Sequence, residues 1–528
     1  MQTDLSDEML EYAKGVFSTF ADRPWRKNQR EAVRWILEQD RKVSVLSAPT
    51  GSGKSLCGAS VLAMYGGGTY LCSSKALQNQ IAIDYPEFKV LMGRNNYTCS
   101  KNEGLTAAEC THSKISPCRH KHDCPYELQK KLVLSSRFKV LNYTYFLFEA
   151  NFVGQFSNLE YLVCDEGDTL EGQLSAFISL NIPLQTIKNY KVGYPSRKTS
   201  TAKDGVESWK DWGAKFKNKV NGSIGKLMAE AGEWDSISSE WQVSKMKQLN
   251  RARNLLSKLN MFTDYVDENW LMEVGKFDKR IRFYPDWIVP ELAEKYFWQH
   301  SEKFLLMSAT FQPVPVLSKL LGLPPGDVIF KEVPSIFPEK NRRVVASPVA
   351  NLTFKTFDSE VHKLIDKIEE ILMHHINDKG LILSVSFKLN KFIMDNVNTG
   401  RLITHDSKNR AHILQEFKNA VSPLVLVSPS YERGISLDDD LGRFCILVKC
   451  PYLSLGDKQV SKRLYGSKLG GIWFKSEAAQ TIVQGAGRIV RSESDWGVTY
   501  ILDRQIMDLI TKHPSYFPRH FIDAIEFG

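Results

Sequence analysis

A glycine-rich segment at residues 48–55, with the sequence APTGSGKS, carries residue types that can hold the phosphates of a nucleoside triphosphate. Glycines at this spacing let backbone N–H groups curl around phosphate oxygens, with the positive end of a helix dipole behind them. Lys54 would then reach the β- and γ-phosphates, and the hydroxyl of Ser55 would hold Mg²⁺. The predicted nucleotide-binding residues of this segment are Thr50, Gly51, Ser52, Gly53, Lys54 and Ser55.

A pair of adjacent acids could supply the chemistry of hydrolysis. The segment LEYLVCDEGD at residues 159–168 leads into Asp165 and Glu166. Asp165 would bind Mg²⁺ through water, and Glu166 would orient and deprotonate the attacking water. Two such acids could also simply face solvent, but the phosphate-binding segment upstream favours the catalytic interpretation.

Two arginines near the C-terminus could stabilise charge on a transferring phosphoryl group. The spacing QxxGRxxR joins Gln484, Gly487, Arg488 and Arg491. Arginines three apart share one helix face. A surface helix often carries such a pair for solubility alone, but the small residues before Arg488 are unusual for a solvated face. We therefore predict arginine fingers from a second domain, which would couple hydrolysis to domain closure.

The flanking patterns predict which elements position these groups. Residues 42–47 (KVSVLS) contain an apolar stretch with two β-branched valines, and a helical pattern follows Lys54, so the glycine-rich segment is predicted between a strand and a helix. An ordinary glycine-rich turn would not need these flanks. The mostly apolar run before Asp165 predicts a second strand, with both acids at its carboxyl end beside the phosphate loop.

Four of the nine cysteines, Cys99, Cys110, Cys118 and Cys124, lie within 26 positions. A disulfide framework, a metal site and chance clustering of small buried residues could each explain the cluster. A chain of 528 residues can bury a sizeable core and does not need disulfides to stay folded. In a reducing compartment, clustered cysteines more often bind metal or act as redox groups. We therefore favour a metal site.

Composition limits the class of protein. No N-terminal stretch resembles a secretion signal, and no run of 18 apolar residues occurs, so we expect a cytoplasmic protein with no membrane partner. The formal charge of +9 arises from 69 Lys plus Arg against 60 Asp plus Glu. This mild excess is compatible with nucleic-acid binding but does not demonstrate it.

Further segments carry a family resemblance over nearly the whole chain. They occur in the order RKNQ (26–29), APTGSGKS, SSKALQNQ (73–80), CDEGD (164–168), LLMSATF (305–311), LILSVSF (381–387), SYERGIS (430–436), QGAGRIVRSESDWG (484–497) and ILDRQ (501–505). GRNNYTC (93–99) and LNYTYFL (141–147) are the most discriminating pieces. In these motifs the chain resembles superfamily 2 DNA helicases of the XPD/DinG iron–sulfur type.

The resemblance implies an α/β fold of two RecA-like parallel-sheet motor domains, with an inserted Fe–S cluster domain and a helical Arch-like domain. ATP would lie between the motors, with Arg26 and Gln29 reading the adenine. The four cysteines would hold a [4Fe–4S] cluster, whose ligands are thiolates. Zinc is a minority alternative, although its sites usually show paired CxxC knuckles and the gaps here are ten, seven and five residues.

By resemblance, the protein is a monomer that translocates 5′ to 3′ on single-stranded DNA and unwinds tailed or forked duplexes. Nucleoid association is compatible with this function. The expected domains are 1–92, 131–170 and 299–322 for the first motor, 93–130 for the cluster domain, 171–298 for the helical insert and 323–528 for the second motor. The insert holds Trp209, Trp212, Trp234, Trp241, Trp270, Trp287 and Trp298, which we interpret as core residues more readily than as base-stacking platforms.

Three features depart from the family pattern. Asp168 stands where the family more often has histidine, Ser436 stands where it usually has aspartate, and the middle two cysteines lie unusually far apart. Hydrolysis should survive these changes, but coupling to nucleic acid could weaken. The alternative function is therefore an ATP-switched nucleic-acid-binding regulator or assembly factor without processive unwinding.

Overall fold

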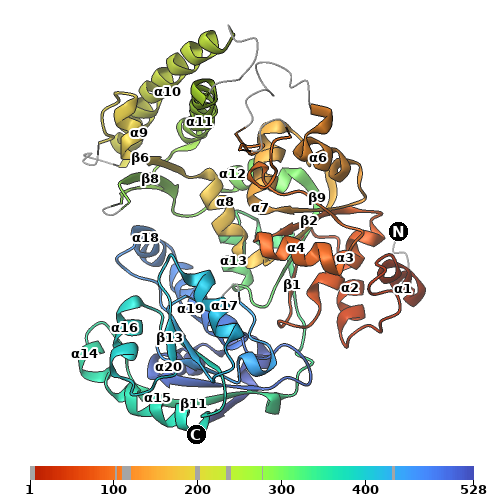
Figure 1. The fold of residues 1–528 in the computed structure, drawn as a ribbon, viewed down its shortest axis with the longest axis vertical. Coiled ribbons are helices and arrows are strands. Elements are labelled where there is room, and N and C mark those ends of the chain that lie inside the picture. Colours follow the sequence, from red (N-terminus) through yellow and green to blue (C-terminus); the bar gives the residue numbers. More distant parts are fainter. Residues whose placement is uncertain are drawn as a thin grey trace.

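The fold was analysed in a computed structural model that describes residues 6–100, 104–109, 121–196, 202–232, 240–275, 278–430 and 435–527. Two parallel sheet domains form the body, and a helical hairpin projects from one end (Figure 1). The predicted fold class, two RecA-like domains, is confirmed. Among the described residues, no helix is both long and apolar enough to cross a membrane.

The first sheet has seven parallel strands in the order β10-β1-β9-β5-β2-β4-β3. Its strands are β1 (Val43–Ser47), β2 (Gly68–Cys72), β3 (Lys89–Val90), β4 (Phe138–Asn142), β5 (Leu159–Asp165), β9 (Ser301–Ser308) and β10 (Val328–Glu332). The central strands are nearly continuous buried runs, as expected for a sheet covered on both faces. Because β10 pairs with β1, this sheet extends ten residues beyond the boundary at 322 predicted from the sequence.

Helices cover both faces of this sheet (Figure 1). One face packs against the N-terminal helices through a core that includes Phe17, Val33 and Leu62, and the other face packs through a core that includes Phe146, Leu170 and Phe304. The helices of this domain are α1 (Asp7–Gly15), α2 (Gln29–Leu37), α3 (Lys54–Met64), α4 (Lys75–Asp84), α6 (Pro125–Ser135), α7 (Tyr143–Phe148), α8 (Leu170–Ile178), α12 (Pro290–Tyr296) and α13 (Val314–Leu320).

The second sheet also has seven parallel strands, in the order β13-β14-β12-β15-β16-β11-β17. They are β11 (Arg342–Ala350), β12 (Gly380–Leu383), β13 (Leu402–Thr404), β14 (Val425–Ser428), β15 (Phe444–Leu447), β16 (Gly497–Asp503) and β17 (Ile525–Phe527). Its helices are α14 (Phe357–Glu360), α15 (Lys363–His374), α16 (Phe387–Asn396), α17 (Arg410–Asn419), α18 (Lys458–Gly466), α19 (Gly470–Ala486), α20 (Arg504–Lys512) and α21 (Arg519–Ile522). Both sheets therefore present the carboxyl ends of parallel strands, where ligands of such folds bind.

The insert between β5 and β9 is not purely helical, in contrast to the sequence prediction. Its base is a three-stranded antiparallel sheet in the order β6-β8-β7, and a long hairpin of two helices projects from this sheet. Its elements are β6 (Leu180–Pro183), α9 (Leu184–Asn189), α10 (Ala202–Gly232), α11 (Glu240–Tyr265), β7 (Trp270–Val274) and β8 (Arg280–Pro285). Residues of β8 alternate between buried and half-buried, because one sheet face packs under the helices.

The tryptophans of the insert mostly fill cores, as we preferred from the sequence. Trp212 and Trp270 pack with Phe262 and Phe283 at the base of the hairpin. Trp287 and Trp298 are also buried, Trp209 is half-buried and Trp241 is 55% exposed. Trp234 lies outside the described residues.

Candidate nucleotide site between the two sheet domains

The glycine-rich segment forms a tight turn between β1 and α3. Gly51 and Gly53 both have φ of 81°, a conformation that favours glycine. A Cβ atom at Gly51 would lie 2.5 Å from the backbone oxygen of Arg491 and 2.7 Å from the Phe337 ring. The phosphate loop is therefore in direct contact with the arginine segment of the second domain, and only glycine fits between them.

Lys54 lies at the first position of α3 and turns back over the loop. Its Nζ donates hydrogen bonds to the backbone oxygens of Ala48 at 2.8 Å and Pro49 at 3.1 Å. Burial lowers the pKa of Lys54 to about 8, the negative charge of Asp165 opposes this shift and Arg491 adds to it. The electrostatic influence of both residues indicates that the predicted lysine, acid and arginine share one region. Ser55 follows Lys54 in the first turn of α3.

Arg26 and Gln29, the predicted adenine-reading residues, also face the phosphate loop. Gln29 is buried, and its Nε2 donates to the backbone oxygens of Ser52 at 3.1 Å and Gly53 at 3.2 Å. Its Oε1 accepts a hydrogen bond from the Arg26 backbone at 2.7 Å, and the Arg26 guanidinium donates to the Gly51 oxygen. These bonds fix the loop carbonyls and turn its N–H groups toward the space where a phosphate can bind.

Asp165 and Glu166 lie at the carboxyl end of β5, as predicted. The buried Asp165 carboxylate accepts a hydrogen bond from the Tyr70 hydroxyl at 2.9 Å and another from the Glu166 backbone at 2.9 Å. Burial raises the pKa of Asp165, and the nearby Lys54 ammonium opposes that rise. Glu166 has φ of 48°, and its carboxylate accepts a hydrogen bond from the Ser73 hydroxyl. The two carboxylates therefore have different partners and can serve different roles.

Asp168 joins the two sheet domains. One oxygen accepts a hydrogen bond from the Ser308 hydroxyl at 2.6 Å, and the other accepts from the Gln484 side-chain amide at 2.9 Å. Gln484 also approaches the Thr310 hydroxyl at 3.5 Å. The departure from histidine noted in the sequence thus places a carboxylate between the end of β9 and helix α19. This link connects the turn that follows β5 in one domain to the last turn of α19 in the other, just before the two arginines.

Arg488 and Arg491 lie beyond Ala486, the last residue of α19, so they do not share a helix face as predicted, but both turn toward a common backbone oxygen. Arg488 donates to the Ile435 oxygen at 2.7 Å and Arg491 donates to it at 3.0 Å. Arg491 also lies 3.8 Å from Asp438, whose carboxylate accepts a hydrogen bond from Ser436. Burial lowers the pKa of Arg491, against the opposing charge of Asp438. Sequence analysis missed Asp438, although a carboxylate two residues after Ser436 was a readable signal.

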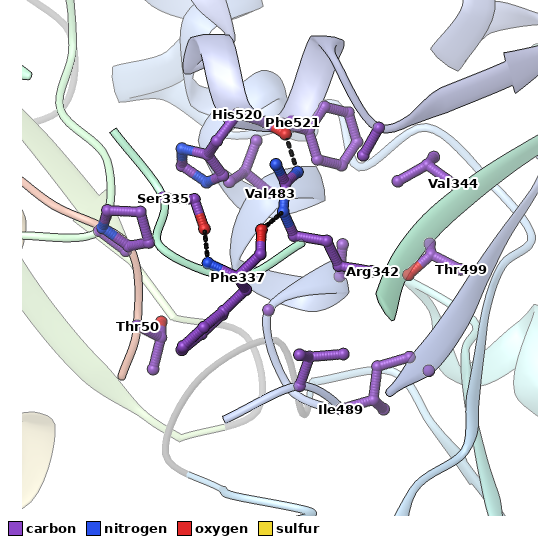
Figure 2. A pocket seen from close by; sticks show the side chains of 17 residues that line it. Thr50, Ser335, Phe337, Arg342, Val344, Val483, Ile489, Thr499, His520 and Phe521 are labelled. Carbon is purple, nitrogen blue, oxygen red and sulfur yellow. Dashed lines mark hydrogen bonds between the residues drawn. The ribbon is translucent and has the colours of Figure 1, made fainter. Parts of the chain in front are cut away.

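A cavity lies on the second-domain side of the phosphate loop (Figure 2). Thr50 lines it from the first domain, and Arg342 and His520 line it from the second. Arg342 donates to the backbone oxygens of Phe337, at 3.1 Å, and His520. Burial lowers the pKa of His520 to about 4, with smaller contributions from the positive charges of Arg342 and Lys54. None of these second-domain residues was identified from the sequence, because they lie in no recognisable motif.

The cysteine segment is described in part. Cys110 and Cys118 lie outside the described residues, whereas Cys99 and Cys124 are free, half-buried thiols. The Tyr97 and Tyr126 rings, each two residues from one of these thiols, pack edge to face with centroids 5.6 Å apart. The two ends of the segment therefore converge. No group of three or more potential metal ligands occurs among the described residues, so the donor set of Cys99, Cys110, Cys118 and Cys124 stays a prediction.

Comparisons with known proteins agree with this architecture. A DEAD/DEAH box helicase family model matches residues 26–180, and a helicase C-terminal domain model matches residues 369–521. A solved XPD helicase superposes with a TM-score of 0.62 at 16% identity, over 96% of this chain and 100% of that one. Xpd4 of S. tokodaii superposes with a TM-score of 0.56 at 14% identity, over 95% and 100% of the two chains.

The chain therefore combines a DEAD/DEAH box helicase domain with a helicase C-terminal domain, and its fold is that of the XPD helicases. ATP-dependent DNA helicase YoaA of Escherichia coli K12 is 29% identical over 104 residues. That match spans 19% of this chain and only 16% of the relative's length. In this helicase, the two family models coincide with the two sheets, since the first contains β1 to β5 and the second contains β12 to β16.

Proposed function

We propose that this protein is an ATP-dependent DNA helicase that translocates 5′ to 3′ on single-stranded DNA and separates tailed or forked duplexes. The observation that carries the proposal is the contact of the phosphate loop with the arginine segment, together with the Asp168–Gln484 hydrogen bond. A site shared in this way can hydrolyse ATP efficiently only when the domains are close. Hydrolysis would thus drive a cycle of closure and opening.

Each residue of the site has a proposed role. Lys54 binds the β- and γ-phosphates, and Ser55 and Asp165 hold Mg²⁺, which would neutralise charge on the phosphates. Glu166 orients the attacking water and accepts its proton. Arg488 and Arg491 stabilise the negative charge of the transferring phosphoryl group, after exchanging their bonds to the Ile435 oxygen for phosphate oxygens. Gln484 couples this step to closure through Asp168.

The thiolates of Cys99, Cys110, Cys118 and Cys124 would hold a [4Fe–4S] cluster beside the nucleic-acid track. The edge-to-face contact of the Tyr97 and Tyr126 rings brings the first and last of these positions together, which fits a single cluster. When bound, the cluster would supply a rigid cross-link for a small domain. DNA rather than RNA as the substrate rests on the family. Backbone contacts would make binding largely independent of sequence and sensitive to salt.

A strand-displacement assay with duplexes that carry a 5′ or a 3′ tail tests the proposal. We expect ATP hydrolysis to be stimulated by single-stranded DNA, and only the 5′-tailed substrate to be unwound. Lys54→Ala should abolish both activities, whereas Lys512→Gln, an exposed change on α20, should leave both intact. Hydrolysis without any stimulation by DNA or RNA would refute a helicase. Stimulated hydrolysis without strand separation on any tailed duplex would favour the ATP-switched regulator.

A further inference from the structure

Helix α18 of the second domain contacts the insert with four neighbouring polar side chains. Lys458 and Lys462 donate to the backbone oxygens of Met272 and Glu268, each at 3.2 Å. Gln459 donates to the Pro285 oxygen at 2.9 Å. These residues, with Arg463, stand at i, i+1, i+4 and i+5, so they share one face of the helix. The contact lies beneath the antiparallel sheet that supports the α10–α11 hairpin (Figure 1).

Arg463 is the centre of this contact. It is only 4% exposed, and its guanidinium pairs with Glu171 at 2.7 Å and donates to the Asp286 backbone oxygen. The guanidinium also lies 5.0 Å from the Trp287 ring centroid and 5.2 Å from that of Trp473. A buried arginine with both ionic and ring partners makes a specific attachment, because removing it would leave Glu171 partly buried without its cation.

The partners of Arg463 belong to three parts of the molecule. Glu171 lies in the first turn of α8, three residues after Asp168, where the chain leaves the first domain for the insert. Trp287 follows β8, where the chain returns, and Trp473 belongs to α19 of the second domain. Trp287 and Trp473 share a small apolar cluster with Val316 of α13. Arg463 of the second domain therefore contacts both ends of the insert, where they join the first domain.

We propose that α18 is a clamp, with Arg463 as its positioning residue, that makes the insert follow the second motor domain during the ATP cycle. The inference rests on the proposed helicase function and adds a moving part to it. The 31-residue helix α10 is about 46 Å long, so a rotation of ~5° at its base moves its far end by roughly 4 Å. A small change in the angle between the motor domains would thus displace the tip of the hairpin by about the distance between neighbouring nucleotides.

The first test compares the number of base pairs separated per ATP hydrolysed. Arg463→Gln should lower this ratio by about 5- to 150-fold, the usual range of coupling between sites, while DNA-stimulated ATP hydrolysis stays within about twofold. Arg463→Lys, which keeps the charge next to Glu171, should recover part of the loss. Lys458→Gln with Lys462→Gln tests the same clamp through one exposed and one half-exposed side chain. Lys512→Gln is the matched control.

Hydrogen exchange on the full chain gives a second readout that does not depend on unwinding. A non-hydrolysable ATP analogue should change exchange in β7, β8 and α18 of the unmodified protein. In Arg463→Gln, the change should remain in both motor domains and disappear from β7 and β8. An unaltered coupling ratio and an unaltered response of β7 and β8 in the variants would overturn the clamp. If the unmodified protein separates no duplex, the helicase proposal fails, and hydrogen exchange still decides whether the clamp exists.

Discussion

The Asp168–Gln484 hydrogen bond provides a quantitative test of how the two motor domains communicate. Asp168→Ala removes the acceptor of both the Gln484 amide and the Ser308 hydroxyl, which are 6% and 5% exposed. A hydrogen bond to a charged group contributes about 1.5–3 kcal/mol. Of these two bonds, the one to Gln484 crosses between the domains, so closure should lose about 2 kcal/mol. At 1.4 kcal/mol per factor of ten, this corresponds to a roughly 30-fold lower population of the closed state.

The assay is DNA-stimulated ATP hydrolysis measured together with ATP affinity. We expect the kcat of Asp168→Ala to fall about 30-fold, with the Kd for ATP unchanged, because Lys54 and the loop carbonyl contacts remain in place. Gln484→Ala should match it, and the double variant should be no worse than either single one, because both remove the same bond. Ser308→Ala keeps the interdomain bond and serves as the control. Additive losses in the double variant would refute the bond as the link between domains.

Further predictions concern the nucleotide pocket, the cysteine segment and the arginine pair. With a pKa of about 8, Lys54 loses its proton as the pH rises through 8. The Kd for ATP, measured by a binding titration, should therefore increase about tenfold per pH unit above pH 8. Lys54→Arg should abolish this pH dependence. Anaerobically purified protein should contain about four irons per chain. Cys124→Ser should lose this iron, whereas the control Cys450→Ala should keep it. Zinc in place of the iron would contradict the cluster. Arg491→Lys should lower kcat at least about tenfold with little change in ATP affinity. A change in ATP affinity larger than the change in kcat would argue against a role of Arg491 in the transition state.

The fold and most of the nucleotide site could be predicted from short contiguous motifs. The phosphate loop, the acid pair and the arginine pair each come directly after a strand or helix whose pattern is visible in the local sequence, and the topology brings them together. The sheet at the base of the insert could not be predicted in the same way. Its strands β6 and β7 are separated by two long helices, so their shared partner β8 becomes apparent only when the chain is folded.

Contacts between the domains were the second class of feature that sequence did not reveal. Phe337 approaches the phosphate loop from the linker between the sheets, and Arg463 reaches Glu171 across 292 positions of the chain. Such contacts depend on the relative placement of two folded units and not on local propensity. The roles proposed for the nucleotide-site residues therefore remain predictions about chemistry, whereas their convergence on one interface is observed.

The two motif departures acquire a common physical explanation in the structure. Asp168, at the position where we expected a histidine, accepts hydrogen bonds from Ser308 and Gln484, so a carboxylate forms an interdomain link here. Ser436 replaces an aspartate, yet it donates to Asp438, and the Asp438 carboxylate lies 3.8 Å from Arg491. A negative charge near the arginine pair is thus supplied from two residues further along the chain. Because Asp168 links the two domains and Asp438 lies beside the arginine pair, the contacts made at the two departures favour a coupled motor over a passive nucleotide switch.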